Sequence, residues 1–198
     1  MELILVRHGL PVRTEPAPGA RATPPDPDLS VTGRDQAQRV AAVLGGERID
    51  TVYASPLRRA VQTVEPIAAR LGLPILLEPG VHEIDMGEDT YIPIEELLPD
   101  EPRTQMYREL LADPNSALFS DFRTTVGAAV DAIITRHPGQ TVIVACHAGV
   151  ISAAVTHLLG VPRTFAFHVD YASATRVRVS RDGRLQVLSV NDRCHLMR

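Results

Sequence analysis

Apolar and polar positions along the chain follow two different spacings. Short, almost unbroken apolar runs are typical of strands that are buried on both faces of a parallel sheet. These runs lie at residues 2–6, 51–55, 74–79 and 141–146. Other segments carry apolar residues at the spacing of an amphipathic helix. The predicted helices span residues 32–45, 55–72, 104–112, 120–137 and 149–159.

Local signals place the ends of the first two helices. Thr32 followed by Asp35 resembles a capping box, so the first helix is expected to begin there and to end at Gly45. Ser55-Pro56 is expected to begin the second helix, with the proline in the first turn, where its missing N–H costs no bond. The apolar face of the first helix consists of Ala37, Val40, Ala41 and Leu44.

Strict alternation of apolar and polar residues marks the carboxyl-terminal part of the chain. It flanks Asp182-Gly183, a dipeptide that favours the tight turn of a β-hairpin. Helices that alternate with buried strands imply a sheet that is covered on both sides. The sequence therefore predicts an α/β fold: a single-domain three-layer sandwich, with a mostly parallel sheet, helices on both faces and an antiparallel C-terminal edge hairpin.

Composition and charge exclude several classes of protein. A hydrophobic content of 44% and a net charge of −4 are typical of a globular protein and argue against nucleic acid as a main partner. No apolar run approaches the roughly 18 residues of a membrane span, and the first residues lack the basic leader of an export signal. The two cysteines form no CxxC pair, which favours a reducing cytoplasm. All 20 basic residues are arginine, which excludes lysine chemistry.

Two apolar runs end in the same way. The run at 2–6 leads into Arg7-His8-Gly9, and the run at 141–146 leads into His147 and a glycine-containing turn. Ligands of open parallel sheets bind beyond the carboxyl ends of the strands, so His8 and His147 are expected to share one pocket. His147 also precedes a helix, whose free N–H groups favour an anion.

Two further segments carry candidate chemistry. "SPLRRAVQT" lies at another strand-to-helix junction, so either Arg58 or Arg59 is placed to reach the same pocket. "HEIDMGED" is acidic. Its carboxylates are open to three interpretations: solvated loop charge, a metal site with His82, or the source of one catalytic acid. The acids are Glu83, Asp85, Glu88 and Asp89.

Together these motifs resemble the histidine phosphatase superfamily, also called the phosphoglycerate mutase-like family. "RHG" matches the family signature, "LSVTGRDQA" a family helix start, and "SPLRRAVQT" the family pattern S-x-L-x-R-A-x-x-T. "CHAGV" is similar to the second-histidine motif, and "HEIDMG" to the acid-bearing segment. The motifs occur in family order across residues 4–155. The resemblance implies one domain over 1–198, with variable pocket segments at 10–28 and 84–118.

The resemblance also implies roles for individual residues. His8 corresponds to the nucleophile and Glu83 to the general acid and base. The family arginine stands directly before the alanine of its motif, which selects Arg59 and leaves Arg58 at a variable position. The residues expected to hold the phosphoryl group are Arg7, Arg59, His147 and the backbone of Gly9 and Ala148.

The chain departs from the family pattern beside the pocket. The residue at the position of a family asparagine is Thr14, and a phosphate contact from Arg13 or Arg21 is an alternative. His82 is a further candidate to line the pocket. The proline-rich segment 10–28 is open to two interpretations, a disordered stretch or a functional loop at the pocket mouth. No metal or other cofactor is expected, because two guanidiniums and helix N–H groups would balance the phosphate charge.

The function implied is hydrolysis of a small phosphorylated metabolite through a covalent phosphohistidine. Two alternatives stay open. One is a cofactor-dependent phosphoglycerate mutase, although "HEIDMGEDTY" lacks the arginine and tyrosine that follow the acid in mutases. The other is a non-catalytic module that binds a phosphorylated ligand on the same fold. A small phosphorylated substrate is the expected partner, with neither nucleic acid nor membrane, and a homodimer is an open alternative.

Overall fold

The computed structural model describes residues 1–13, 26–84, 104–105 and 117–197. Its strands form one six-stranded sheet in the order β3-β2-β4-β1-β5-β6. The strands are β1 (Glu2–Arg7), β2 (Thr51–Ala54), β3 (Ile75–Leu77), β4 (Thr141–Cys146), β5 (Ala174–Val179) and β6 (Leu185–Asp192). The pairs β3–β2, β2–β4 and β4–β1 are parallel, whereas β5 pairs antiparallel with both β1 and β6. The predicted sheet and its C-terminal edge hairpin are confirmed.

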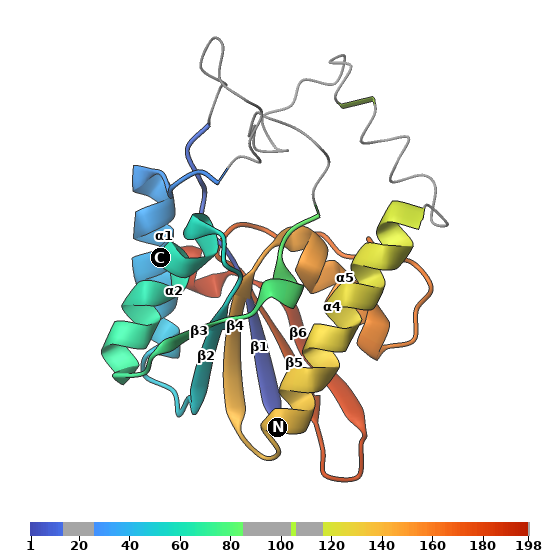
Figure 1. Cartoon of the computed structure of the whole chain (residues 1–198). Helices are drawn as coiled ribbons and strands as arrows, with labels where there is room; N and C mark the ends of the chain where they lie inside the picture. The colour runs from blue at the N-terminus through green and yellow to red at the C-terminus, as the bar shows by residue number, and fades with distance from the viewer. Residues whose placement is uncertain (14–25, 85–103, 106–116, 198) are drawn as a thin grey trace.

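Helices cover both faces of the sheet, as predicted. Figure 1 shows α1 and α2 together on one side, and α4 and α5 on the other. The helices are α1 (Val31–Leu44), α2 (Arg58–Leu71), α4 (Ala117–Arg136) and α5 (Ala148–Leu158). Two short 3₁₀ turns complete the described elements, η1 (Pro79–Val81) and η3 (Cys194–Leu196), and η3 packs against α1.

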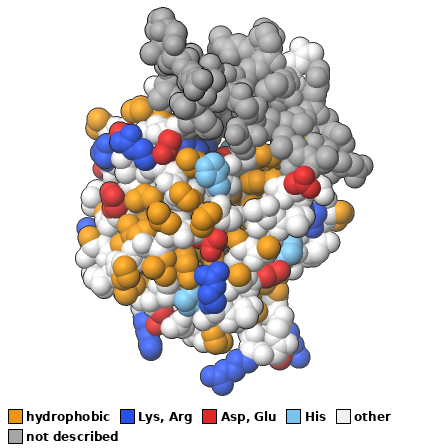
Figure 2. Space-filling view, in the orientation of Figure 1, with side chains coloured by type: hydrophobic (Ala, Val, Ile, Leu, Met, Phe, Trp, Pro, Cys, Tyr) orange, Lys and Arg blue, Asp and Glu red, His pale blue; other side chains and the backbone are white. Residues whose placement is uncertain are grey.

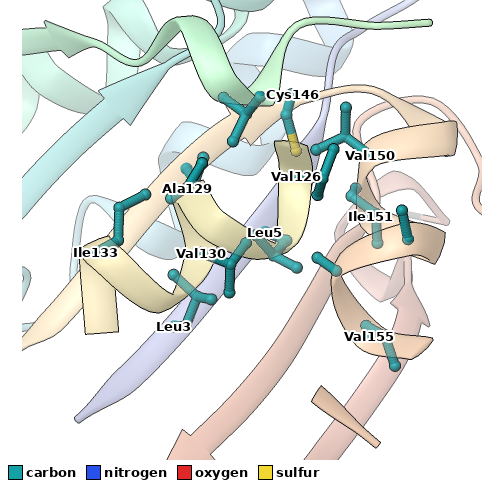
Figure 3. Close-up of a cluster of buried hydrophobic side chains, with 14 of the residues drawn as sticks. Leu3, Leu5, Val126, Ala129, Val130, Ile133, Cys146, Val150, Ile151 and Val155 are labelled. Carbon is teal, nitrogen blue, oxygen red and sulfur yellow. The ribbon is translucent and has the colours of Figure 1, made fainter. Parts of the chain in front are cut away.

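The alternation of side chains along the central strands divides the core in two. Leu3 and Leu5 of β1 join α4 and α5 in one cluster, whereas Ile4 and Val6 join α1 and α2 in the other. Figure 3 shows the first cluster, in which Val130 of α4 lies beside both leucines. Burial of each such side chain stabilises the fold by about 1.5–3 kcal/mol. The central strand β1 is thus packed on both faces, by α4 and α5 on one and by α1 and α2 on the other.

Two helix starts differ from the prediction. α1 begins at Val31 because Ser30 is its N-cap and accepts a hydrogen bond from the Gly33 N–H, so the capping box at Thr32 is wrong. The Ser30 hydroxyl also donates to the Leu10 carbonyl, a contact that no local pattern predicts. α2 begins at Arg58, two residues after the expected proline. Of the helix predicted at 104–112, only residues 104–105 lie within the described part, and both are helical.

The described helices include none that is both long enough and apolar enough to cross a bilayer. On the face shown in Figure 2, apolar side chains are interspersed with charged ones.

Candidate active site

Three parallel strands deliver polar residues to one edge of the sheet. His8 follows β1, His147 follows β4 and Ser55 follows β2, and β4 lies between the other two strands. The centroids of the two imidazole rings lie 5.1 Å apart. The histidines are 139 positions apart in the chain, and the parallel register of β1 with β4 brings them together. Both rings are almost fully buried.

The surroundings of His8 define which of its nitrogens is reactive. Nδ1 lies 2.8 Å from the carbonyl oxygen of Gly9, and since a carbonyl only accepts, Nδ1 carries the hydrogen. Burial lowers the pKa of His8 well below its ordinary value, and the charges of Arg59 and Arg7 lower it further. A neutral ring protonated on Nδ1 has its lone pair on Nε2. His8 is therefore prepared as a nucleophile through Nε2.

The turn after His8 is tied to α2. The Gly9 N–H donates to the hydroxyl of Thr63 at 2.9 Å, and that hydroxyl donates to the Arg59 carbonyl at 2.7 Å. A Cβ on Gly9 would lie 2.6 Å from the Gly33 carbonyl oxygen, so a larger residue does not fit. The turn at Gly9 thus packs against α1 and is hydrogen-bonded to α2.

Arg7 is held by a residue that the sequence analysis missed. Its guanidinium donates to the Val169 carbonyl at 2.6 Å and lies 3.6 Å over the ring of Tyr171. The same ring lies 5.5 Å from that of His8. Stacking on an aromatic face favours a cation and restricts its motion. No motif marks Tyr171, because its contacts bridge some 164 positions of sequence.

The two arginines at the start of α2 have different environments. Arg59 is 3% exposed, and its charge lowers the pKa values of both His8 and His147. Arg58 faces solvent and forms an ion pair with Asp28 at 2.7 Å. Asp26 lies 3.9 Å from the Arg59 guanidinium and accepts a hydrogen bond from the Arg58 N–H. Of the two arginines, Arg59 is the buried one and Arg58 is the exposed one.

Glu83 lies at the same edge of the sheet, two residues after η1. One carboxylate oxygen accepts from the Ile84 N–H at 3.0 Å, and the other lies 3.4 Å from the Gly149 N–H at the start of α5. Burial raises the pKa of Glu83, while the Ile84 bond, Arg59, the Gly149 contact and Arg7 lower it in part. A raised pKa suits a group that must both donate and accept a proton near neutrality.

His147 contacts Ser55 rather than a charged group. Its Nε2 lies 2.9 Å from the Ser55 hydroxyl, and its Nδ1 is buried with no hydrogen-bond partner among the described residues. Burial lowers its pKa well below the ordinary value, and the charges of Arg59 and Arg7 act in the same direction. His147 is therefore a neutral ring.

The remaining candidates lie at the rim or outside the described residues. His82 is exposed, and its Nδ1 donates to the Glu83 carbonyl at 2.8 Å. Ala148 is the first residue of α5, and Arg13 is exposed. The described residues contain no group of three His, Cys, Asp or Glu side chains that would hold a metal ion. Candidates outside the described residues are Thr14, Arg21, Asp85, Glu88 and Asp89.

The buried neutral histidines predict that stability falls in acid. His8 and His147 take up protons in the unfolded chain as the pH drops below 6.5, but resist protonation in the fold. Their contribution is complete above that pH and is lost toward the lowered folded pKa values. Protonation of these two groups in the unfolded chain lowers the unfolding free energy by roughly 3 kcal/mol between about pH 7.5 and pH 5.5. Urea unfolding at several pH values measures this loss.

Glu83, with its raised pKa, changes the unfolding free energy with pH in the opposite direction. The contribution of one histidine is therefore isolated by comparing wild type with the His8→Ala variant. Its unfolding free energy should fall about half as much over the same pH interval. An equal fall in both proteins would mean that His8 is protonated as readily in the fold as in the unfolded chain.

Comparisons with known proteins agree with this geometry. The model of the "Histidine phosphatase superfamily (branch 1)" matches residues 3–193. Phosphoserine phosphatase 1 of Hydrogenobacter thermophilus is 31% identical, over 99% of this chain and 94% of the relative. A probable phosphoglycerate mutase of Yersinia enterocolitica is 28% identical, over 82% of this chain and 76% of the relative.

Solved structures show the same fold. A phosphoserine phosphatase of Entamoeba histolytica, crystallised with 3-phosphoglyceric acid, superimposes with a TM-score of 0.74 and 25% identity, over 98% of each chain. A mycobacterial glucosyl-3-phosphoglycerate phosphatase, in complex with VO3, gives a TM-score of 0.78 at 23% identity, over 97% of this chain and 99% of the other. With the family model matching nearly its whole length, the chain belongs to branch 1 of the histidine phosphatase superfamily.

Proposed function

We propose that the protein hydrolyses phosphomonoesters of small metabolites through a phosphohistidine on His8, and that phosphoserine is the first substrate to test. The observation that carries the proposal is the state of His8. Its ring is neutral and protonated on Nδ1, so the lone pair is on Nε2, and the charges of Arg59 and Arg7 act on the ring. Phosphoserine is named because the relative with 31% identity over nearly the whole chain is a phosphoserine phosphatase.

In the first step, Nε2 of His8 attacks the phosphorus atom. An N–P bond forms and the P–O bond to the leaving group breaks. Glu83 in its protonated form, which its raised pKa favours, donates its proton to the leaving oxygen and releases an alcohol. The positive guanidiniums of Arg7 and Arg59 balance the negative charge that spreads over the phosphoryl oxygens. The Gly9 carbonyl stabilises the cationic ring by accepting from Nδ1–H.

In the second step, a water molecule attacks the phosphohistidine from the side of Glu83. The carboxylate takes a proton from the water, the new O–P bond forms and the N–P bond breaks. The products are inorganic phosphate, a neutral His8 and a protonated Glu83, so the cycle is closed. One carboxyl group serves both steps because the leaving group and the water occupy the same position in turn.

A panel of phosphomonoesters tests the proposed function. The panel contains phosphoserine, 3-phosphoglycerate, a sugar phosphate and para-nitrophenyl phosphate, each incubated in the presence of a chelator. We expect release of inorganic phosphate, with phosphoserine turned over at a kcat/KM in the range of about 10⁴ M⁻¹s⁻¹ or more. A different ester at the top of the panel would correct the substrate and keep the reaction.

The same panel separates the two alternatives. Adding a bisphosphorylated glycerate to 3-phosphoglycerate would reveal a mutase by rapid isomer exchange without free phosphate. A binding module would show ligand affinity in calorimetry with neither phosphate release nor isomer exchange. Either outcome would overturn the proposed hydrolysis.

A further inference from the structure

Ser55 occupies a buried position next to the site. Its side chain is fully buried at the carboxyl end of β2, and its N–H donates to the Ala145 carbonyl of β4 at 2.9 Å. The strand pairing therefore fixes the serine backbone against the strand that carries His147. Its hydroxyl lies 2.9 Å from Nε2 of His147.

The direction of this hydrogen bond follows from the other partners of the two groups. Within the described residues, the Ser55 hydroxyl oxygen is otherwise reached by the Leu57 N–H at 3.4 Å, a long contact in which the oxygen accepts. If the hydroxyl donates to Nε2, the ring carries its hydrogen on Nδ1. If Nε2 donated instead, both the hydroxyl hydrogen and the Nδ1 lone pair would be buried without partners. The first arrangement leaves one group unsatisfied and the second leaves two.

We propose that Ser55 is a positioning residue: its hydroxyl donates to Nε2 of His147, and so reserves the Nδ1–H of a neutral His147 as a donor to the phosphoryl group. The inference rests on the proposed function, which places that group on His8. The ring of His147 lies next to the ring of His8, and its Nδ1 is buried without a hydrogen-bond partner among the described residues. A buried N–H donor that is already oriented toward the position of an oxyanion does not have to reorient when the reaction begins.

A neutral donor also preserves the nucleophile. A cationic His147 beside His8 would add a third positive charge to those of Arg7 and Arg59, whereas a neutral ring stabilises the phosphoryl oxygens by hydrogen bonding alone. Ser55 thus controls where the proton of His147 resides, and it touches neither substrate nor phosphorus.

Nuclear magnetic resonance tests the proposal directly. In protein labelled with ¹⁵N-histidine, long-range proton–nitrogen correlations distinguish a ring protonated on Nδ1 from one protonated on Nε2. The His147→Asn variant assigns the signals, and inorganic phosphate is the probe ligand. We expect wild-type His147 to be protonated on Nδ1 near pH 7, with a shift of that proton when phosphate binds. A ring protonated on Nε2, or on both nitrogens, would overturn the proposal whatever the enzyme hydrolyses.

Variants add a kinetic measurement. Ser55→Ala should lower kcat/KM by roughly 10- to 100-fold and give a mixture of His147 tautomers, and Ser55→Thr, which keeps the hydroxyl, should restore both. Ser173→Ala is the matched control, because Ser173 is also fully buried and its hydroxyl has no partner among the described residues. Unchanged tautomer and activity in Ser55→Ala would refute the role. Absence of any phosphatase activity in wild type would count against the proposed function, while the tautomer measurement would still decide the role of Ser55.

Discussion

Replacing His8 by alanine is expected to reduce phosphomonoester turnover by roughly 10⁴- to 10⁶-fold, because the variant has no atom in place to form the N–P bond. Water would have to attack the ester directly, in a site arranged for an imidazole. The loss should be similar for every substrate in the panel, whatever its leaving group. Steady-state release of inorganic phosphate measures it.

Trapping of the intermediate makes this prediction specific to His8. Wild-type protein mixed with labelled substrate and quenched should retain label that is stable in base and lost in acid, as phosphohistidine is, and His8→Ala should retain none. His168→Ala is the control, because the His168 side chain is 74% exposed, and it should behave as wild type. Turnover in His8→Ala above about one per cent of wild type would refute the covalent mechanism.

Replacing Glu83 by glutamine is expected to affect poor leaving groups far more than good ones. Glutamine keeps the size of the side chain but has no acidic proton. Formation of phosphoenzyme from phosphoserine, whose leaving group is an alkoxide, should slow by roughly 10²- to 10⁴-fold. With para-nitrophenyl phosphate, whose leaving group needs no proton, the loss should be about tenfold or less.

The measurement is a rapid quench under single-turnover conditions, which isolates the first step from hydrolysis of the intermediate. Glu65→Gln is the matched control, because Glu65 is exposed on α2, away from the site. Equal losses for the two substrates in Glu83→Gln would contradict the acid role. They would leave Glu83 as a group that merely shapes the pocket.

Gly149→Ala examines the same carboxylate from the opposite side. A Cβ at this position would lie 2.5 Å from a carboxylate oxygen of Glu83, and the flexible end of that side chain is the part able to move. We therefore expect a folded protein with the leaving-group dependence of Glu83→Gln. Gly46→Ala is the control, because a Cβ there meets its nearest atom at 3.6 Å.

The sequence predicted the sheet well because the signal lies within each strand. Apolar runs such as those of β1 and β4 are unbroken, and side chains buried on both faces require that pattern whatever the tertiary details. The start of α1 was predicted wrongly because Ser30, rather than Thr32, caps the helix by accepting from the Gly33 N–H, and its hydroxyl is also held by the Leu10 carbonyl, twenty positions away. A local capping pattern at Thr32 could not report that contact.

For the candidate site, too, the sequence reports local motifs better than contacts between distant residues. The five motifs supplied the candidate residues, including Glu83, which composition alone left open among four acids. The residues that hold them in place were missed, although Ser55 and Thr63 are the first and last letters of "SPLRRAVQT" and could have been questioned on that ground. Tyr171 carries no such mark. Its contact with Arg7 exists only after β5 has paired with β1.

The position of β1 within the sheet has a consequence for biosynthesis. Of the six strands of this sheet, β1 is made before the others, yet it lies between β4 and β5, both of which are made long afterwards. Until β4 and β5 have been synthesised, β1 has no strand with which to pair in this sheet. Because His8 follows β1 and His147 follows β4, the two imidazoles come together only after β4 has been made and has paired with β1.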